Sequence, residues 1–177
     1  MSLKYAVLGF LNDTKLSGYD LQKKIDNTIN HFWPSTQSQI YRTLKELVEG
    51  GLIEMQIIYQ DDKPNKKIYS ITENGNNDLE IWLNSKIELP NHRNQFLVQL
   101  FFSINIDNEN IVENLIHYKE IMISRLKFLE NELSIIQGKN INKKQKIYAL
   151  IAENGIWALK NEIKWTEYAI NTINNEE

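Results

Sequence analysis

A proline and a pair of glycines set the limits of one helix near the start of this 177-residue chain. Pro34 disfavours helical backbone in the residue before it, so a helix here begins at Ser35 or Thr36, and either side chain can cap it. Gly50 and Gly51 favour a left-handed cap, so the helix ends there after about four turns. Its apolar residues recur at the spacing of a single helical face: Ile40, Leu44, Leu47 and Val48. The sequence therefore predicts a short amphipathic helix seated on a core.

The polar face of this helix has an unusual charge distribution. Its first two turns contain no acidic residue, although a helix N-terminus favours carboxylates. Free N–H groups, amides, hydroxyls and cations in this region suit the phosphates and base edges of DNA. We therefore predict as DNA-contacting residues Thr36, Gln37, Ser38, Gln39, Tyr41, Arg42 and Lys45. The alternative is a face in water, on which Arg42 pairs with Glu46. Lys45 and Glu49 would form a second pair of the same kind.

The order of elements around this helix indicates a winged helix-turn-helix domain. A stripe from Leu3 to Leu11 predicts a first helix, and Ser17 can cap a second. After the two glycines, β-rich runs flank the turn "DDKPN", which predicts a β-hairpin. Thr72 can then cap a further helix. We assign residues 1–86 to this domain and expect a mainly α fold with a small β-hairpin.

The turn of the hairpin carries a second set of candidate DNA contacts. Basic residues at this position could reach the neighbouring groove or the DNA backbone. The residues that we predict to do so are Lys63, Asn65, Lys66 and Lys67. Asp61 and Asp62 dilute this charge. The alternative is therefore a solvated turn without a DNA contact.

Residues 87–177 are predicted to form a helical dimerisation domain. A short apolar helix follows Asn94, a long helix runs from about Asp107 to Gln137, and a last helix runs from about Asn142 to Ile173. The apolar residues of the long helix are spaced close to a heptad seam, which favours association between helices. With one aromatic residue of the last helix, this seam gives the predicted dimerisation residues: Ile111, Leu115, Tyr118, Met122, Leu126, Leu129, Leu133 and Trp165.

Composition and motifs exclude several other classes of protein. The chain contains no cysteine, which excludes disulfides and thiolate metal sites. Without a signal peptide or an apolar run of membrane-spanning length, we expect a cytoplasmic protein. The three histidines lie far apart, and no nucleophile or phosphate-loop motif occurs, so we predict no catalytic residue, metal or cofactor. Because the net charge is −3, DNA binding would have to depend on local charge.

Aromatic residues provide a candidate effector site. Trp33 precedes the helix with the unusual polar face, Phe96 follows a linker at residues 87–94, and Tyr148 and Trp157 lie on the last helix. A ring-walled cavity between the two domains would suit a flat aromatic molecule. The alternative for each residue is packing in the core.

Four stretches of the chain resemble the PadR family of bacterial transcriptional regulators. They read "LKYAVLGFL", "LSGYDLQKKI", "FWPSTQSQIYRTLKELVEGGLI" and "KKIYSITENGNNDLEIWL". The resemblance is dense over residues 3–84, and the long helical tail is similar to that of the branch with a longer C-terminal domain. By this resemblance, residues 36–45 correspond to the reading helix and residues 61–67 to the wing.

The resemblance implies a particular mode of action. The C-terminal helices pair in a homodimer, the two winged helices bind a pseudo-palindromic operator, and repression often lasts until a small molecule binds. Phenolic acids are the best-known effectors of the family. We therefore expect a sequence-specific, ligand-responsive repressor. The alternative is a winged helix that serves as a protein-interaction module, whose binding should depend less steeply on salt than DNA binding does.

Overall fold

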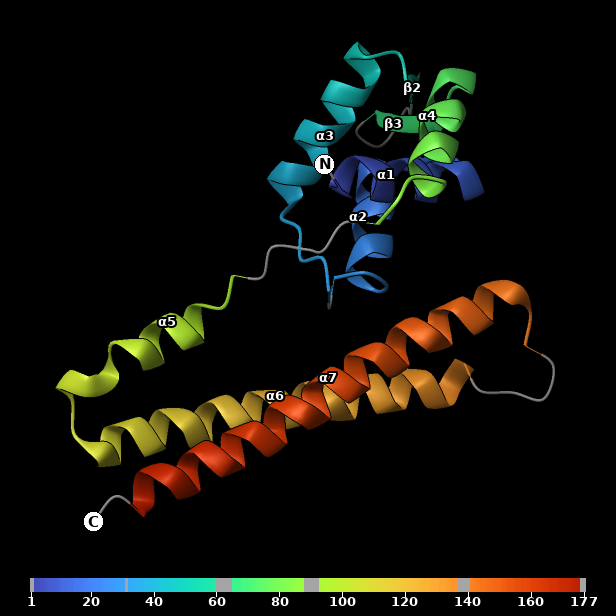
Figure 1. Ribbon diagram of the computed structural model, residues 1–177. Helices are drawn as coiled ribbons and strands as arrows, with labels where there is room; N and C mark the ends of the chain where they lie inside the picture. Colours follow the sequence, from blue (N-terminus) through green and yellow to red (C-terminus); the bar gives the residue numbers. More distant parts are fainter. Residues whose placement is uncertain (1, 31, 60–64, 88–92, 137–140, 176–177) are drawn as a thin grey trace. The chain divides into compact units, whose positions relative to one another are not determined.

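The computed structural model describes residues 2–30, 32–59, 65–87, 93–136 and 141–175. The chain forms two compact units, Met1–Leu89 and Pro90–Glu177 (Figure 1). The boundary falls where the sequence changes from mixed helical and strand patterns to wholly helical ones.

The N-terminal unit combines helices with a small antiparallel sheet. In chain order, its described elements are α1 (Ser2–Asp13), β1 (Leu16–Ser17), α2 (Gly18–Asp26), α3 (Gln37–Glu49), β2 (Ile53–Ile58), β3 (Lys66–Ile71) and α4 (Glu73–Leu83). The predicted mainly α fold with a small hairpin is confirmed. The short strand β1 extends the hairpin to three strands in the order β1-β3-β2, with Leu16 opposite Tyr69. The sequence pattern does not predict β1, because two residues show no alternation.

Side-chain caps begin the helices at residues that the sequence indicates. Ser17 caps α2 and Thr72 caps α4. Thr36 caps α3, since its hydroxyl accepts a hydrogen bond of 3.3 Å from the backbone N–H of Gln39. At the other end of α3, Gly51 has a φ of 67°, the left-handed conformation that favours glycine. Both ends of α3 are therefore set by local chemistry.

A single cluster of apolar side chains holds this unit together. Its buried members are Val7, Leu8, Leu11, Leu21, Ile25, Ile40, Leu44, Leu47, Ile53, Tyr69 and Leu79. Three of the four residues predicted to seat α3 belong to this cluster, and Val48 packs against it. Gly75 allows α4 to approach the chain just before β2, because a Cβ there would overlap the carbonyl oxygen of Leu52. The polar face of α3 is therefore presented by a packed scaffold.

The C-terminal unit is helical in its described residues. Its elements are α5 (Gln95–Phe101), the short 3-10 helix η1 (Ser103–Asn105), α6 (Asn108–Ile136) and α7 (Lys143–Asn174). The long helices α6 and α7 lie antiparallel along one another as a hairpin (Figure 1). A Cβ at Gly155 of α7 would lie 2.7 Å from Cδ1 of Leu129 on α6, so glycine permits a close approach at this level.

The apolar seam of α6 is partly buried within its own chain. Its buried members are Ile111, Leu115, Met122 and Leu129, and its half-buried members include Tyr118, Leu126 and Leu133. The helix α7 contributes buried residues in turn: Ala149, Ala152, Ile156 and Thr166. Heptad spacing identifies a face that packs on a helix, but it does not say which chain supplies that helix. The dimerisation role predicted for this seam stays a prediction, and its buried members already pack within one chain.

Candidate nucleic-acid interface

The helix α3 presents its predicted DNA-contacting residues to solvent. All seven of them are exposed: Thr36, Gln37, Ser38, Gln39, Tyr41, Arg42 and Lys45. The opposite face is anchored by Ile40 and Leu44, which are at most 1% exposed. No acidic residue lies in the first turn of α3. The N-terminal end of the helix therefore offers N–H groups and neutral or cationic side chains to an anion.

One predicted reading residue has a second task at this end of the helix. The side-chain oxygen of Gln39 accepts a hydrogen bond of 2.9 Å from the backbone N–H of Thr36. With the Thr36 hydroxyl bonded to the N–H of Gln39, this completes a capping box. The amide of Gln39 is thereby oriented by its own helix. A base contact by Gln39 would use its amide nitrogen or would require the cap to open.

The two ion pairs of the alternative interpretation are present on α3. Nε of Arg42 lies 2.9 Å from Oε1 of Glu46, and Nζ of Lys45 lies 3.7 Å from Oε1 of Glu49. All four side chains are exposed. Exposed pairs of this spacing contribute about 0.3–0.5 kcal/mol, so an incoming phosphate can replace the carboxylate. The pairs are therefore compatible with either interpretation of this face.

A third ion pair lies at the base of the wing. Nζ of Lys66, the first residue of β3, lies 3.0 Å from Oδ2 of Asp20 on α2. The hydroxyl of Ser17 donates a hydrogen bond of 2.6 Å to the same oxygen. The Ser17 hydroxyl and then Lys66 lower the pKa of Asp20. Lys66 is predicted to contact DNA, and in the structure its ammonium group pairs with Asp20 of α2, a helix of the helix-turn-helix. Sequence spacing does not reveal this pair, because its members are far apart in the chain.

A shallow hollow lies between α3 and the base of the wing. Its volume is about 310 Å³, and its lining consists of Ser17, Gly18, Tyr19, Tyr41, Asn65, Lys66, Lys67 and Tyr69. The ring of Tyr41 lies directly over the backbone of Gly18, where a Cβ would approach it to 2.8 Å. Four predicted DNA contacts therefore meet in this hollow. Lys63 lies outside the described residues.

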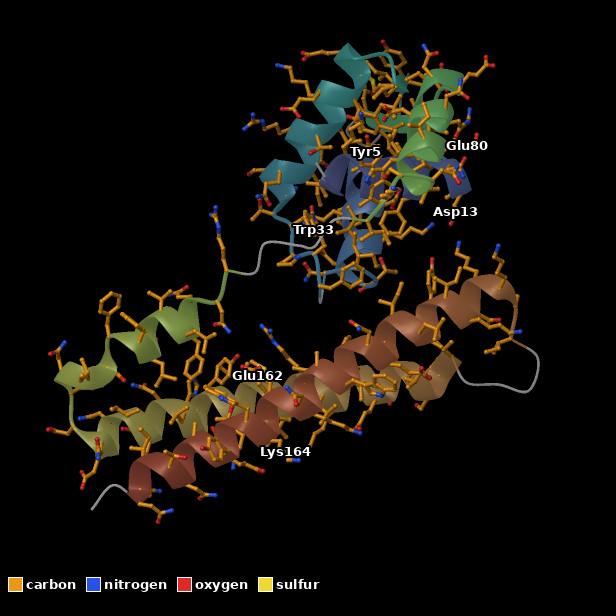
Figure 2. The ribbon with its side chains drawn as sticks, in the orientation of Figure 1. Tyr5, Asp13, Trp33, Glu80, Glu162 and Lys164 are labelled. Atoms are coloured by element: carbon orange, nitrogen blue, oxygen red, sulfur yellow. The ribbon has the colours of Figure 1, made fainter. Side chains whose placement is uncertain are left out.

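The predicted effector residues fall into different surroundings. Trp33 belongs to the N-terminal unit, at the turn before α3 (Figure 2), and is partly exposed. In the C-terminal unit, Phe96 stacks on Tyr118 with 3.8 Å between ring centroids and meets Trp165 edge-on at 6.4 Å. Tyr148 and Trp157 are exposed on α7. Phe96 is thus grouped with two residues that the sequence assigned to dimerisation.

The aromatic cluster of Phe96, Tyr118 and Trp165 includes a hydrogen bond to α7 and borders a cavity. The Tyr118 hydroxyl donates a hydrogen bond of 3.0 Å to Oε1 of Glu162, which is labelled on α7 in Figure 2. Burial, and then this bond, raise the pKa of Tyr118. Beside Phe96 is a cavity of about 310 Å³ lined by Phe96, Gln99, Leu100, Phe102, Ser103, Ile106, Ile111 and Asn114. It combines an apolar wall with a few amide and hydroxyl groups, as small-molecule sites do.

The part of the chain that the structure describes contains neither a metal-binding cluster nor a membrane-spanning helix. Its histidines, aspartates and glutamates form no group of three that could hold a metal ion. None of its helices is long and apolar enough to cross a membrane.

Comparison with known proteins identifies the family. The profile described as "Transcriptional regulator PadR-like family" matches residues 7–81, and the profile "Virulence activator alpha C-term" matches residues 92–174. The chain belongs to the PadR family of transcriptional regulators. The resemblance predicted from the sequence is therefore confirmed, including the branch with the longer C-terminal domain. The first profile covers all elements of the PadR-like domain from within α1 to within α4.

PadR relatives match almost the entire chain. The "Negative transcriptional regulator PadR" of Bacillus subtilis is 25% identical over 179 residues, which cover 98% of each chain. A crystal structure of Bacillus subtilis PadR with operator DNA has a TM-score of 0.84 and 26% identity, and the match covers 98% of this chain and 99% of that one. A structure of the same protein with p-coumaric acid, at 23% identity and a TM-score of 0.76, covers 98% and 96% and shows the shared fold.

Proposed function

We propose that this PadR-family chain is a ligand-responsive repressor that binds a pseudo-palindromic operator as a homodimer. One observation carries the DNA-binding part: the N-terminal turns of α3 are exposed, free of acidic residues and held by a buried opposite face. In helix-turn-helix proteins, this end of the second motif helix enters the major groove. The operator complex of Bacillus subtilis PadR supports the same reading for this chain.

Within this proposal, the DNA-facing residues have different tasks. Arg42 is suited to guanine or to a phosphate, whereas Lys45 is a point charge for a phosphate. Tyr41, Lys66 and Lys67 line the hollow between α3 and the wing, along which we expect the DNA backbone to pass. The predicted contacts at Asn65, Lys66 and Lys67 remain part of the proposal.

Dimerisation is proposed from exposed apolar side chains of the C-terminal unit. On and after α5 they include Leu97, Val98, Phe101, Phe102 and Ile104, and on α6 and α7 they include Ile121, Phe128, Ile135, Leu150 and Trp157. Phe101 and Trp157 are 77% and 72% exposed. Exposed apolar side chains that form a contiguous patch mark protein interfaces. A second copy of the chain would remove them from water and would place two readers on the two half-sites.

The effector is proposed to be a small aromatic molecule such as a phenolic acid. The cavity beside Phe96 has the size and the mixed lining that such a molecule requires. The p-coumaric acid complex of Bacillus subtilis PadR is in keeping with this chemical class. The assignments of Trp33, Tyr148 and Trp157 to the effector site remain predictions. We propose no catalytic role, and we expect the repressor to act in the cytoplasm of a bacterial cell, where its operator would lie.

The experiment that tests this function combines selection with a salt titration. A random-sequence duplex library is passed over the purified protein, and the enriched duplex is measured by fluorescence anisotropy. Each phosphate neutralised should contribute about −0.9 to the slope of log affinity against log salt. Arg42→Ala should weaken binding by roughly 1–3 kcal/mol. Glu130→Gln in the C-terminal unit provides a control outside the reading face, because Glu130 pairs with Lys160 there.

The same experiment separates the proposed repressor from a protein-interaction module. If no duplex is enriched, or if binding does not depend on salt, the chain does not read DNA. If a duplex is enriched and Arg42→Ala binds it as tightly as the unaltered chain, the assigned reading face is wrong.

A further inference from the structure

Three cations of the DNA-facing surface are paired with carboxylates. Arg42 lies 2.9 Å from Glu46, Lys45 lies 3.7 Å from Glu49, and Lys66 lies 3.0 Å from Asp20. Residues 1–89 contain ten Lys and Arg against twelve Asp and Glu, a formal net charge of −2. This unit therefore lacks the excess positive charge that ordinarily holds a protein on any DNA sequence.

Such pairs affect operator and non-operator DNA differently. Non-specific binding is supplied by phosphates that meet cations, and it involves a looser complex than base readout does. At a distance, a phosphate competes poorly with a carboxylate that is already within hydrogen-bond reach of the cation. At an operator, base contacts by α3 bring particular phosphates close, and the weak exposed pairs can then exchange partners.

We propose that Asp20, Glu46 and Glu49 are specificity-determining residues of this regulator. They neutralise Lys66, Arg42 and Lys45 on non-operator DNA and release these cations only where base contacts bring the phosphates close. The inference rests on the proposed DNA-binding function and concerns its selectivity. It gives the acidic residues of the surface a role that a count of basic residues does not reveal.

The three carboxylates differ in how firmly they are held. Glu46 and Glu49 are exposed on α3 and are free to swing into water once their cations turn to DNA. Asp20 remains tied to Ser17 by the hydrogen bond of 2.6 Å, so it keeps its position when Lys66 moves away. Asp20 therefore also repels any phosphate at the base of the wing that is not positioned by other contacts. We expect it to have the largest individual effect on selectivity.

The expected effects follow from the two kinds of complex. Each phosphate that a cation neutralises contributes about 0.9 to the slope of log affinity against log salt. If that contact contributes nothing at 1 M salt, each freed cation should raise the affinity for non-operator DNA roughly fivefold at 0.15 M salt. On the operator the cations already contact phosphates, so each substitution removes only the cost of breaking the ion pair. Operator affinity should therefore rise by a factor of about two per substitution. Removing all three carboxylates should therefore lower the ratio of operator to non-operator affinity by about fifteenfold.

The test uses the enriched duplex and a scrambled duplex of the same length and composition. The variants are Asp20→Asn, Glu46→Gln, Glu49→Gln and the triple substitution, all in the full chain. The matched control is Glu130→Gln, which makes the same charge change beside Lys160 in the C-terminal unit. The triple variant should bind the scrambled duplex with a steeper salt dependence, by up to about 2.7 in slope. Its salt slope on the enriched duplex should not change.

Three results would overturn the proposal. The carboxylates are not selectivity residues if both duplexes gain affinity equally, or if Glu130→Gln has the same effect as the triple variant. Because Asp20 also receives the Ser17 hydrogen bond, the double variant of Glu46 and Glu49 repeats the test on α3 alone, and an unchanged ratio there would also refute the proposal. An unaltered chain that enriches no duplex would instead refute the proposed function.

Discussion

Replacing Gly18 with alanine should displace Tyr41 from the DNA-facing surface while leaving the N-terminal unit folded. The added methyl group would lie 2.8 Å from Cε1 and Cζ of Tyr41 and 2.9 Å from its hydroxyl oxygen. Carbon atoms pack best at about 3.5–4.0 Å, so the ring must retreat by roughly 0.7–1.2 Å. Tyr41 is 42% exposed, so its ring can turn toward water to do so.

The cost of this movement should appear in DNA binding rather than in stability. Gly18 begins α2, where alanine favours the helix by up to about 0.5–1 kcal/mol and offsets part of the steric cost. The thermal midpoint should therefore change by only a few degrees. Operator binding should weaken by about 1 kcal/mol, roughly fivefold, because one hydrogen bond from the Tyr41 hydroxyl is lost.

Fluorescence anisotropy on the enriched duplex and thermal melting by circular dichroism measure the two effects. Gly9→Ala is the matched control, since a Cβ at Gly9 meets nothing within 4 Å. The double variant Gly18→Ala/Tyr41→Ala should bind no more weakly than Tyr41→Ala, because the ring to be displaced is absent. The reasoning is refuted if Gly18→Ala binds like the unaltered chain, or if its penalty adds fully to that of Tyr41→Ala.

Other substitutions test the remaining parts of the proposal. Phe101→Asp should shift the chain from dimer to monomer in sedimentation velocity, because it puts a charge on an exposed apolar surface; an unchanged dimer would place the interface elsewhere. Phe96→Ala should weaken binding of p-coumaric acid in calorimetry while operator binding persists, and equal affinity would exclude the cavity beside Phe96. Gly75→Ala should lower the free energy of unfolding by more than about 2 kcal/mol in urea titrations, since the methyl group meets the Leu52 carbonyl; a smaller loss would mean that the backbone yields. The raised pKa of Tyr118 means that the folded chain holds this proton more tightly than the unfolded one. Stability from this group should therefore be complete below about pH 10 and be lost as pH rises through the folded pKa, and Tyr118→Phe should flatten that decline in urea titrations across this pH range.

The N-terminal unit was predictable from sequence because its determinants are local. Pro34 and Gly51 limit α3, Thr36 caps it, and the apolar stripe selects the face that is buried. Each of these signals operates within a few residues of the position it controls. The strand β1 is different, because its two residues acquire their conformation by pairing with β3, far along the chain. Such pairing leaves no periodic signal in the segment itself.

The candidate site was predictable as a surface but not as a network. Helical spacing predicts the exposed face of α3 and its two ion pairs, because the two members of each pair are four residues apart. It does not predict that Lys66 meets Asp20, or that Tyr41 covers Gly18, since these contacts depend on how α2, α3 and β3 pack. From the sequence, Lys66 is predicted only as a DNA contact of the wing, whereas in the structure it also pairs with Asp20 of α2.

In the C-terminal unit, the apolar face of α6 and the apolar surface left exposed to a second copy are formed by different residues. Heptad spacing on α6 predicts an apolar face, and the natural inference was that this face binds a second copy. In the structure the buried part of that face is occupied within the chain, as Leu129 near Gly155 illustrates. The side chains left in water belong to other positions, including Phe101 after the linker and Trp157 on α7. Side chains that are already buried within the chain gain no further burial from a partner. A dimer therefore removes the most apolar surface from water if it covers this second set of side chains, outside the seam.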